Sequence, residues 1–187
     1  MLMILILSVI VASSLAQSPI FKYPHFTPMA NFEVAKIVGN WSQVAKTPNK
    51  FDEDEKCTNA ELILENLGVI NVGISSISTK NGHARNIKGA GTPDSHKASS
   101  VFNFRYNISF LSKSPGELIV LDTDYKNYLV LMGIIPIAKI GSFRSWFQVA
   151  WIYSKKSEMS PEHYARALEV LHKNHIPTHK IERAPKC

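Results

Sequence analysis

The sequence predicts an all-β protein with a single helix near its C-terminus. From Trp41 onward, short runs alternate apolar and polar side chains with a period of two, which is typical of half-buried strands. Turn residues such as Asn81 and Gly82 separate these runs at near-regular spacing. A helical pattern appears only after the last run. The 187 residues suffice for one well-buried core and are few for two domains.

Eight strands are expected, and their spacing fits either a two-sheet sandwich or a closed barrel. They cover residues 41–47, 59–65, 69–78, 82–92, 101–110, 116–124, 127–135 and 145–153. A further short strand is expected over residues 179–184.

The helix is expected to begin after Ser160, which is a suitable N-cap, with Pro161 in its first turn. Leu168 and Leu171 recur at helical spacing, and Pro177 ends the segment. One amphipathic helix that follows eight strands is expected to lie against the outside of the sheet.

The N-terminus reads as a secretory signal. Residues 1–16 form an apolar run that ends in small residues, with Ser14 and Ala16 at the spacing that a signal peptidase recognises. The run is too short to span a bilayer comfortably. We therefore expect a signal peptide over residues 1–16, one domain over residues 17–187, and an extracellular protein.

Secretion affects how the two cysteines are interpreted. In an oxidising compartment Cys57 and Cys187 are expected to pair, which stabilises the fold by roughly 4 kcal/mol in the chain-entropy model. Two glycosylation sequons begin at Asn40 and Asn107. Asn107 is the better acceptor, since Asn40 adjoins Trp41, which is expected to be buried.

Charge and histidine content point to no other class of site. The net charge is +6, but the basic residues are scattered and no Gly-rich phosphate loop occurs, so no nucleic-acid partner is expected. The seven histidines form no cluster with metal-ligand spacing, and neither His83 nor His96 has a clear inward phase. No metal site is expected.

Three motifs make the chain resemble the lipocalins, particularly the branch of apolipoprotein D and the insect bilin-binding proteins. The first is a Gly-x-Trp on the first strand, the second a Thr-Asp-Tyr at the turn between the sixth and seventh strands, and the third a basic residue after the eighth strand. The matching residues are Gly39, Trp41, Thr123, Asp124, Tyr125 and Lys155.

The resemblance implies an eight-stranded up-and-down antiparallel β-barrel with one C-terminal α-helix outside it. Trp41 would close the floor with a cation across its ring. The cation here is Lys155, where the family usually has Arg, so the floor is expected to be held less firmly. Residues 48–56 would form the first large loop over the mouth.

A ligand pocket follows from strand phase and from the same resemblance, which aligns Phe104 and Trp151 with cavity aromatics of the branch. We expect a deep, mostly apolar pocket with few polar groups. The alternative is that these side chains fill a closed core. The predicted lining residues are Leu62, Phe102, Phe104, Tyr106, Met132, Phe147, Val149 and Trp151.

Residues 133–143 are unusually apolar for a loop at the open end, and Pro136 is expected to break strand pairing there. Two interpretations stay open: a surface that docks on lipid, lipoprotein or a partner, and a segment that folds inward and caps the mouth. The apolar side chains concerned are Ile134, Ile135, Ile137 and Ile140.

The predicted function is a secreted carrier of a small hydrophobic ligand such as a bilin, a steroid, a fatty acid or another lipid. No cofactor is required, although a bilin or lipid would bind non-covalently. The alternatives are a bilin pigment protein and a lipocalin that sequesters amines or haem. Catalysis is not expected, because paired cysteines supply no thiolate and residues 52–55 are interpreted as a solvated acidic loop.

Overall fold

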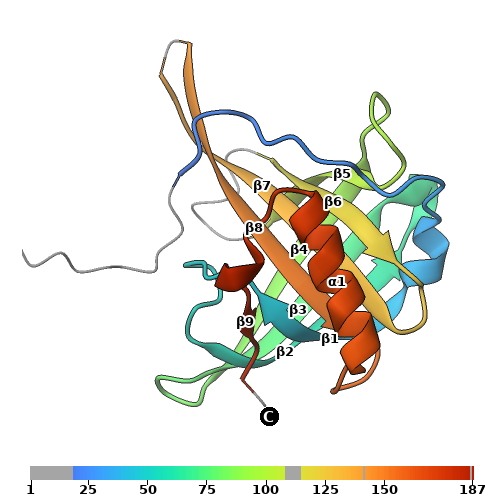
Figure 1. Cartoon of the computed structure of the whole chain (residues 1–187), viewed down its shortest axis with the longest axis vertical. Coiled ribbons are helices and arrows are strands. Elements are labelled where there is room, and N and C mark those ends of the chain that lie inside the picture. The colour runs from blue at the N-terminus through green and yellow to red at the C-terminus, as the bar shows by residue number, and fades with distance from the viewer. Residues whose placement is uncertain (1–18, 108–114, 141, 186) are drawn as a thin grey trace, which may run out of the picture.

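A computed structural model describes residues 19–107, 115–140, 142–185 and 187; the predicted signal peptide lies outside this part of the chain. The strands form a barrel with one helix across its outer surface (Figure 1). The strands are β1 Gly39–Lys46, β2 Glu55–Leu64, β3 Ile70–Ser78, β4 Ala84–Pro93, β5 Val101–Tyr106, β6 Gly116–Thr123, β7 Tyr128–Ile140, β8 Phe143–Ser154 and β9 Glu182–Arg183. The helices are α1 Pro161–Lys173 and the short 3-10 turns η1 Val34–Ile37, η2 Asn66–Gly68 and η3 Thr178–Lys180.

The sheet closes on itself, which decides between the sandwich and the barrel. Each strand from β1 to β8 pairs antiparallel with the next, and β8 returns to β1, with Ser42 opposite Ser154. The predicted up-and-down barrel is therefore confirmed. Its floor lies at the turn between β6 and β7, and its mouth lies at the loops that join β1 to β2 and β7 to β8.

Strand β1 has three neighbours. Its first half pairs with β2, from Gly39 opposite Leu62 to Ser42 opposite Asn59. Beyond that point β2 diverges, and β9 pairs with Ala45 and Lys46 instead. The disulfide between Cys57 and Cys187, which was predicted, fixes the tail beside this divergence.

Alternation along the strands creates two separate cores. Side chains such as Trp41, Leu129 and Trp151 point into the barrel. Their neighbours along the strands, such as Val130 and Ile152, point outward and pack with Leu171 of α1. The helix lies against β6 and β7. The barrel wall on this side is therefore buried on both faces.

The helix forms as its capping residues predict. The Ser160 side chain accepts a hydrogen bond from the backbone N–H of His163 over 3.2 Å, and Pro161 is the first helical residue. At the other end the backbone N–H of Ile176 donates to Leu171 O over 3.0 Å, with His175 at a positive φ of 59°. No helix of the described residues is long and apolar enough to cross a membrane.

The sequence predicted a loop in the apolar segment near the mouth, and this prediction is wrong. The segment belongs to β7 and β8, which remain paired as far as Ile140 opposite Phe143, and this hairpin projects beyond the other strands (Figure 1). The prediction that Pro136 breaks strand pairing is wrong: the register shifts between Pro136 and Ala138, and pairing then continues. Ile20 bridges to the outer edge of the hairpin at Trp146.

Candidate ligand-binding site

Trp41 closes the lower end of the barrel. Its side chain is 1% exposed, and its indole N–H donates to Ile37 O over 2.7 Å, which ties η1 across the floor. Lys155 Nζ lies 4.2 Å from the centre of a Trp41 ring and donates to Val38 O over 2.8 Å. Burial lowers the pKa of Lys155, so loss of water offsets part of this attraction.

The second motif is a tight turn that braces the same floor. One oxygen of Asp124, Oδ1, accepts from the backbone N–H groups of Lys126, Asn127 and Tyr128 over 2.7–3.1 Å. This network holds Tyr125 at a positive φ of 65°, where its ring stacks on Phe32 with the centroids 6.2 Å apart. Thr123, Asp124 and Tyr125 thus shape this turn, and none of the three is among the residues that line the cavity described below.

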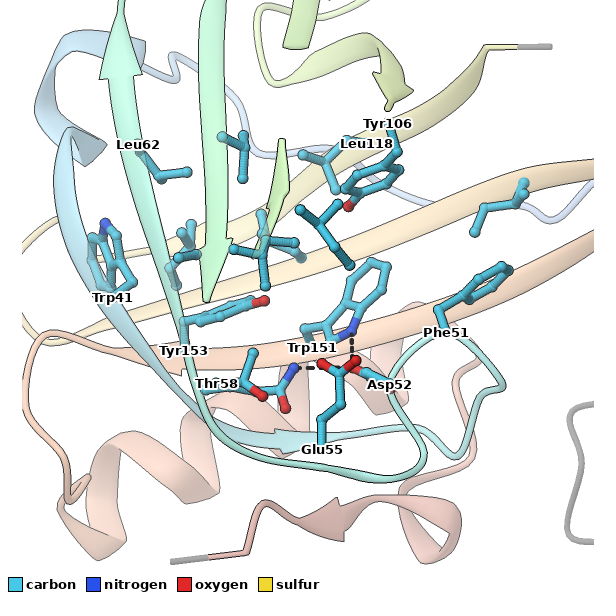
Figure 2. Close-up of a pocket in the computed structure, with 18 residues that line it drawn as sticks. Trp41, Phe51, Asp52, Glu55, Thr58, Leu62, Tyr106, Leu118, Trp151 and Tyr153 are labelled. Carbon is cyan, nitrogen blue, oxygen red and sulfur yellow. Dashed lines mark hydrogen bonds between the residues drawn. The ribbon is translucent and has the colours of Figure 1, made fainter. Parts of the chain in front are cut away.

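Above Trp41 the barrel encloses a cavity of about 60 Å³ (Figure 2). Most of its wall is aliphatic or aromatic, and several polar side chains gather along one side. The lining residues are Trp41, Gln43, Phe51, Asp52, Glu55, Thr58, Ala60, Leu62, Val72, Ile74, Ile87, Tyr106, Leu118, Leu129, Leu131, Ile135, Trp151 and Tyr153.

Three of the eight predicted pocket residues line this cavity: Leu62, Tyr106 and Trp151. Leu62 and Tyr106 come from β2 and β5, whose sequences alternate, and Trp151 comes from β8, where the family resemblance indicated it. Their role in binding stays a prediction, since no ligand contact is shown.

Three others point into the barrel but do not line the cavity. Phe102 lines a second, smaller void of about 20 Å³ that shares Leu62 with this cavity, Phe104 covers Gly89, and Val149 packs on Gly133. A Cβ at Gly89 would lie 2.6 Å from the Phe104 ring, and one at Gly133 would lie 2.8 Å from Val149. Both glycines therefore let a neighbouring side chain lie close to the wall, away from the open space.

The last two predicted pocket residues lie elsewhere. Phe147 is half-buried near the mouth, with its ring 6.3 Å from that of Phe51. Met132 belongs to the outer core under α1, where its sulfur accepts a hydrogen bond from Gln148 over 3.2 Å. The prediction that Met132 lines the pocket is wrong, because β7 presents Leu131 to the interior.

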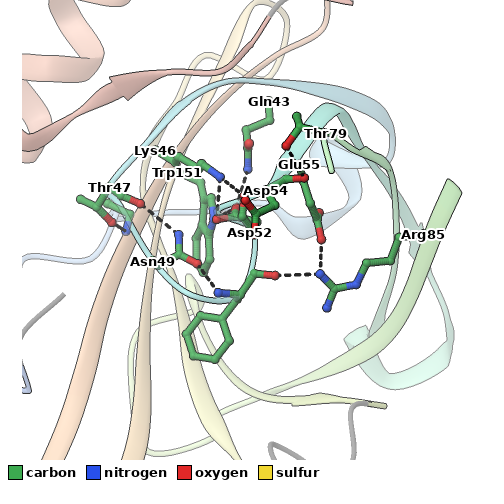
Figure 3. Close-up of polar contacts among 12 residues, drawn as sticks. Gln43, Lys46, Thr47, Asn49, Asp52, Asp54, Glu55, Thr79, Arg85 and Trp151 are labelled. Carbon is green, nitrogen blue, oxygen red and sulfur yellow. Dashed lines mark hydrogen bonds and ion pairs between the residues drawn. The ribbon is translucent and has the colours of Figure 1, made fainter. Parts of the chain in front are cut away.

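The polar side of the cavity is centred on Asp52, from the loop over the mouth (Figure 3). Its side chain accepts hydrogen bonds at Oδ2 from Trp151 Nε1 over 3.1 Å and from Gln43 Nε2 over 3.2 Å. Lys46 Nζ lies 2.8 Å from Oδ1 and also donates to the Asp52 carbonyl. The ion pair is almost fully buried, so it fixes the loop against the barrel wall.

Glu55 is the second acidic residue in the wall, and Arg85 of β4 pairs with it from outside the cavity. Arg85 Nη1 also donates to Phe51 O over 3.0 Å. The prediction of a solvated acidic loop is therefore wrong for Asp52 and Glu55, both of which are buried; between them Glu53 is exposed.

A bulge in β2 explains why Glu55 was missed. Pairing with β3 shifts by one residue between Lys56 and Asn59. Because one extra residue reverses the alternation, Glu55 faces inward together with Thr58 and Ala60. The sequence offers no clear signal of this bulge.

Two phenols complete the polar set. Burial raises the pKa of Tyr106, and the negative charge of Asp52 raises it further. Burial likewise raises the pKa of Tyr153, with smaller contributions from Tyr106 and Asp52. Both side chains are therefore neutral hydrogen-bonding groups at physiological pH.

The isoleucines of the β7–β8 hairpin do not form one surface. Ile134 is buried in the outer core and Ile135 lines the cavity, whereas Ile137 is 43% exposed. The side chain of Ile140 lies outside the described residues. The docking surface as predicted is therefore wrong for Ile134 and Ile135.

The two sequon asparagines, Asn40 and Asn107, are both exposed, although Asn40 precedes the buried Trp41. Ser109, the last residue of the second sequon, lies outside the described residues. His83 and His96 are exposed. Within the described part of the chain, no cluster of His, Cys, Asp and Glu could hold a metal ion.

Comparison with known proteins agrees with this architecture. The chain is 27% identical to bovine (Bos taurus) apolipoprotein D over 160 residues, which cover 86% of this chain and 80% of its relative. Insecticyanin from the tobacco hornworm Manduca sexta superposes with a TM-score of 0.71 at 21% identity, covering 91% of this chain and 90% of that one.

Lobster apocrustacyanin A1 superposes with a TM-score of 0.67 at 18% identity, covering 89% and 94% of the two chains. At these identities the two superpositions establish the fold. Residues 32–186 match the family described as the lipocalin-like domain, which is most of the chain. The chain therefore belongs to the lipocalin family.

Proposed function

We propose that the protein is a secreted carrier that binds a small hydrophobic ligand inside its barrel. The observation that carries this proposal is the cavity inside the barrel between the Trp41 floor and the loop that holds Phe51 and Asp52. Membership of the lipocalin family supports it, as does the disulfide between Cys57 and Cys187, which suits an extracellular protein.

The size of the cavity limits how a ligand can be held. A volume of about 60 Å³ is well below the roughly 300–1,000 Å³ of ordinary small-molecule sites, so a ligand must displace side chains. Several lining side chains are only half-buried and have the most room to move; among them are Phe51, Ile74, Tyr106, Leu118 and Ile135. A slender, flexible hydrocarbon chain requires the least displacement.

The test uses N-phenyl-1-naphthylamine, a neutral fluorescent probe, with two variants of adjacent β2 residues. Ala60 lines the cavity and Glu61 is exposed on the outer face, so Ala60→Phe fills the cavity and Glu61→Phe adds the same ring outside. Saturable binding by wild type and Glu61→Phe, but not by a folded Ala60→Phe protein, is expected. Equal binding by both variants would contradict a site inside the barrel.

A bilin pigment protein and a sequestering protein are narrower versions of the same proposal. The visible absorption and mass spectrum of protein from its native source would separate them, since a bilin or haem is coloured and an amine or fatty acid is not. A thiol enzyme is disfavoured, because both cysteines of the chain form the disulfide.

Of the hairpin isoleucines that the structure describes, Ile137 is the one exposed enough to contact a lipid surface. Its side chain is 43% exposed near the projecting tip. Leu67, which is 94% exposed in η2 at the floor, is a matched control. Docking through the hairpin predicts that Ile137→Asp, but not Leu67→Asp, reduces flotation with liposomes; equal flotation of both would remove this role.

A further inference from the structure

Thr58 carries a buried hydroxyl group without a partner in the wall of the cavity. Among the described residues, two side chains have a buried polar atom that makes no hydrogen bond: Thr58 Oγ1 and Ser76 Oγ. Each residue is 5% exposed, but only Thr58 lines the cavity. An unsatisfied buried hydroxyl costs about 1–3 kcal/mol, so a group that bonds to it on binding recovers that cost.

The charges around Thr58 restrict what that group can be. Asp52 and Glu55 are the charged residues among the described side chains that line the cavity, and Figure 2 labels them together with Thr58. Their partners Lys46 and Arg85 do not line it. A bound carboxylate would therefore face two carboxylates, with the compensating cations behind them.

A positively charged head group is disfavoured for a different reason. Each acidic side chain already has a cation: Lys46 Nζ is 2.8 Å from Asp52, and Arg85 contacts Glu55. The four charges balance, so an added ammonium would be buried without a counter-ion of its own, which costs several kcal/mol. An uncharged head needs no such compensation.

We propose that the cavity selects ligands with an uncharged hydroxyl head over those with a free carboxylate, and that Thr58 Oγ1 bonds to this head. The aliphatic chain would then lie along Leu62, Val72 and Leu131 on the apolar side. This inference rests on the proposed function, because it assumes that the ligand enters the barrel.

The experiment compares dodecan-1-ol, dodecanoate and dodecylamine as competitors of bound N-phenyl-1-naphthylamine at pH 7.4. The three share one chain and differ in the head. We expect the alcohol to compete at least about tenfold more strongly than the acid and more strongly than the amine, because burial of an uncompensated charge is costly.

The variants are Thr58→Val, which replaces the hydroxyl by a methyl group, Thr58→Ser, which retains it, and Ser76→Ala as the matched control. Thr58→Val is expected to weaken the alcohol about fivefold, as loss of one neutral hydrogen bond does. Thr58→Ser should restore most of the affinity, and Ser76→Ala should leave it unchanged. Circular dichroism before each titration confirms that the variant is folded.

Failures of the two proposals are distinguishable. If wild type does not bind the naphthylamine probe or any dodecyl compound, the carrier function itself is overturned. If it binds them but the acid or amine competes as well as the alcohol, the head-group preference is wrong. If Thr58→Val leaves the preference for the alcohol unchanged, the proposed role of Thr58 is wrong. Thr58 also borders a groove outside β1 and β2.

Discussion

Trp151 donates a hydrogen bond from its indole N–H to Asp52 Oδ2 over 3.1 Å, which joins β8 to the loop over the mouth. The same carboxylate pairs with the buried Lys46. One side chain thus fixes the loop, orients a cavity aromatic and neutralises a buried cation. The mouth and the wall are parts of one network.

Removing the Asp52 side chain should therefore destabilise the whole fold. Asp52→Ala leaves the Lys46 ammonium buried without its partner, and we expect a loss of about 3–5 kcal/mol in the free energy of unfolding. Urea denaturation followed by fluorescence measures it. Glu53→Ala, at an exposed neighbouring position, should change stability by less than about 0.5 kcal/mol. Equal effects would show that the network does not hold the loop.

The floor gives a second prediction. Lys155→Met removes the cation over Trp41 and the hydrogen bond to Val38 O, and it should destabilise the protein by about 1–2 kcal/mol. Lys155→Arg should match or exceed wild type, because a guanidinium can stack on the indole and still donate. Urea unfolding of the three proteins decides this; a more stable Met variant would mean that desolvation outweighs the attraction.

Acid should weaken the turn at Asp124. Burial raises the pKa of Asp124, but hydrogen bonds from Asn127, Tyr128 and Lys126 outweigh it and hold the pKa below its usual value. Since the folded pKa is lower than the unfolded one, the stabilisation is complete above about pH 4 and is lost as pH falls through the folded pKa. The difference in stability between wild type and Asp124→Ala should therefore be larger at pH 7 than at pH 3.

His163 Nε2 lies 3.8 Å from Asp124 Oδ2, so both proteins are best measured in a His163→Gln background, which removes this contact. A difference in unfolding free energy that does not change between pH 7 and pH 3 would contradict the role of the ionised carboxylate.

Reduction of the disulfide should lower stability without changing the architecture. The Cys57–Cys187 bond spans 130 residues, and its loss is expected to cost about 2–5 kcal/mol. For a chain of this size that corresponds to a fall in Tm of roughly 5–15 °C. Thermal unfolding of wild type and a Cys57→Ser, Cys187→Ser double variant measures the shift. A loss of far-UV signal at 25 °C instead would mean that the tail is needed for the barrel to form.

The sequence determined the elements of this protein and their order. A strand whose outer face meets water shows alternation, so the inward phase of Leu62 in β2 could be predicted. Trp151 lies in β8, whose outer face is buried at Ala150 and Ile152, and its inward position was predicted from the family resemblance. Local chemistry also fixed the helix at Ser160 and Pro161, and the motif around Trp41 identified the floor.

The tertiary structure decided which side chains face into the barrel wherever the alternation along a strand is lost or interrupted. The first part of β7 is buried on both faces, by the interior and by α1, so its sequence is apolar from Tyr128 to Ile135 and gave no reason to place Met132 outside. In β2 a one-residue bulge turned Glu55 inward, and pairing with Lys46 made burial of Asp52 tolerable. The bulge appears only in the pairing of β2 with β3, and Asp52 also bonds to Trp151, 99 residues away, which is why the polar side of the cavity emerged only with the fold.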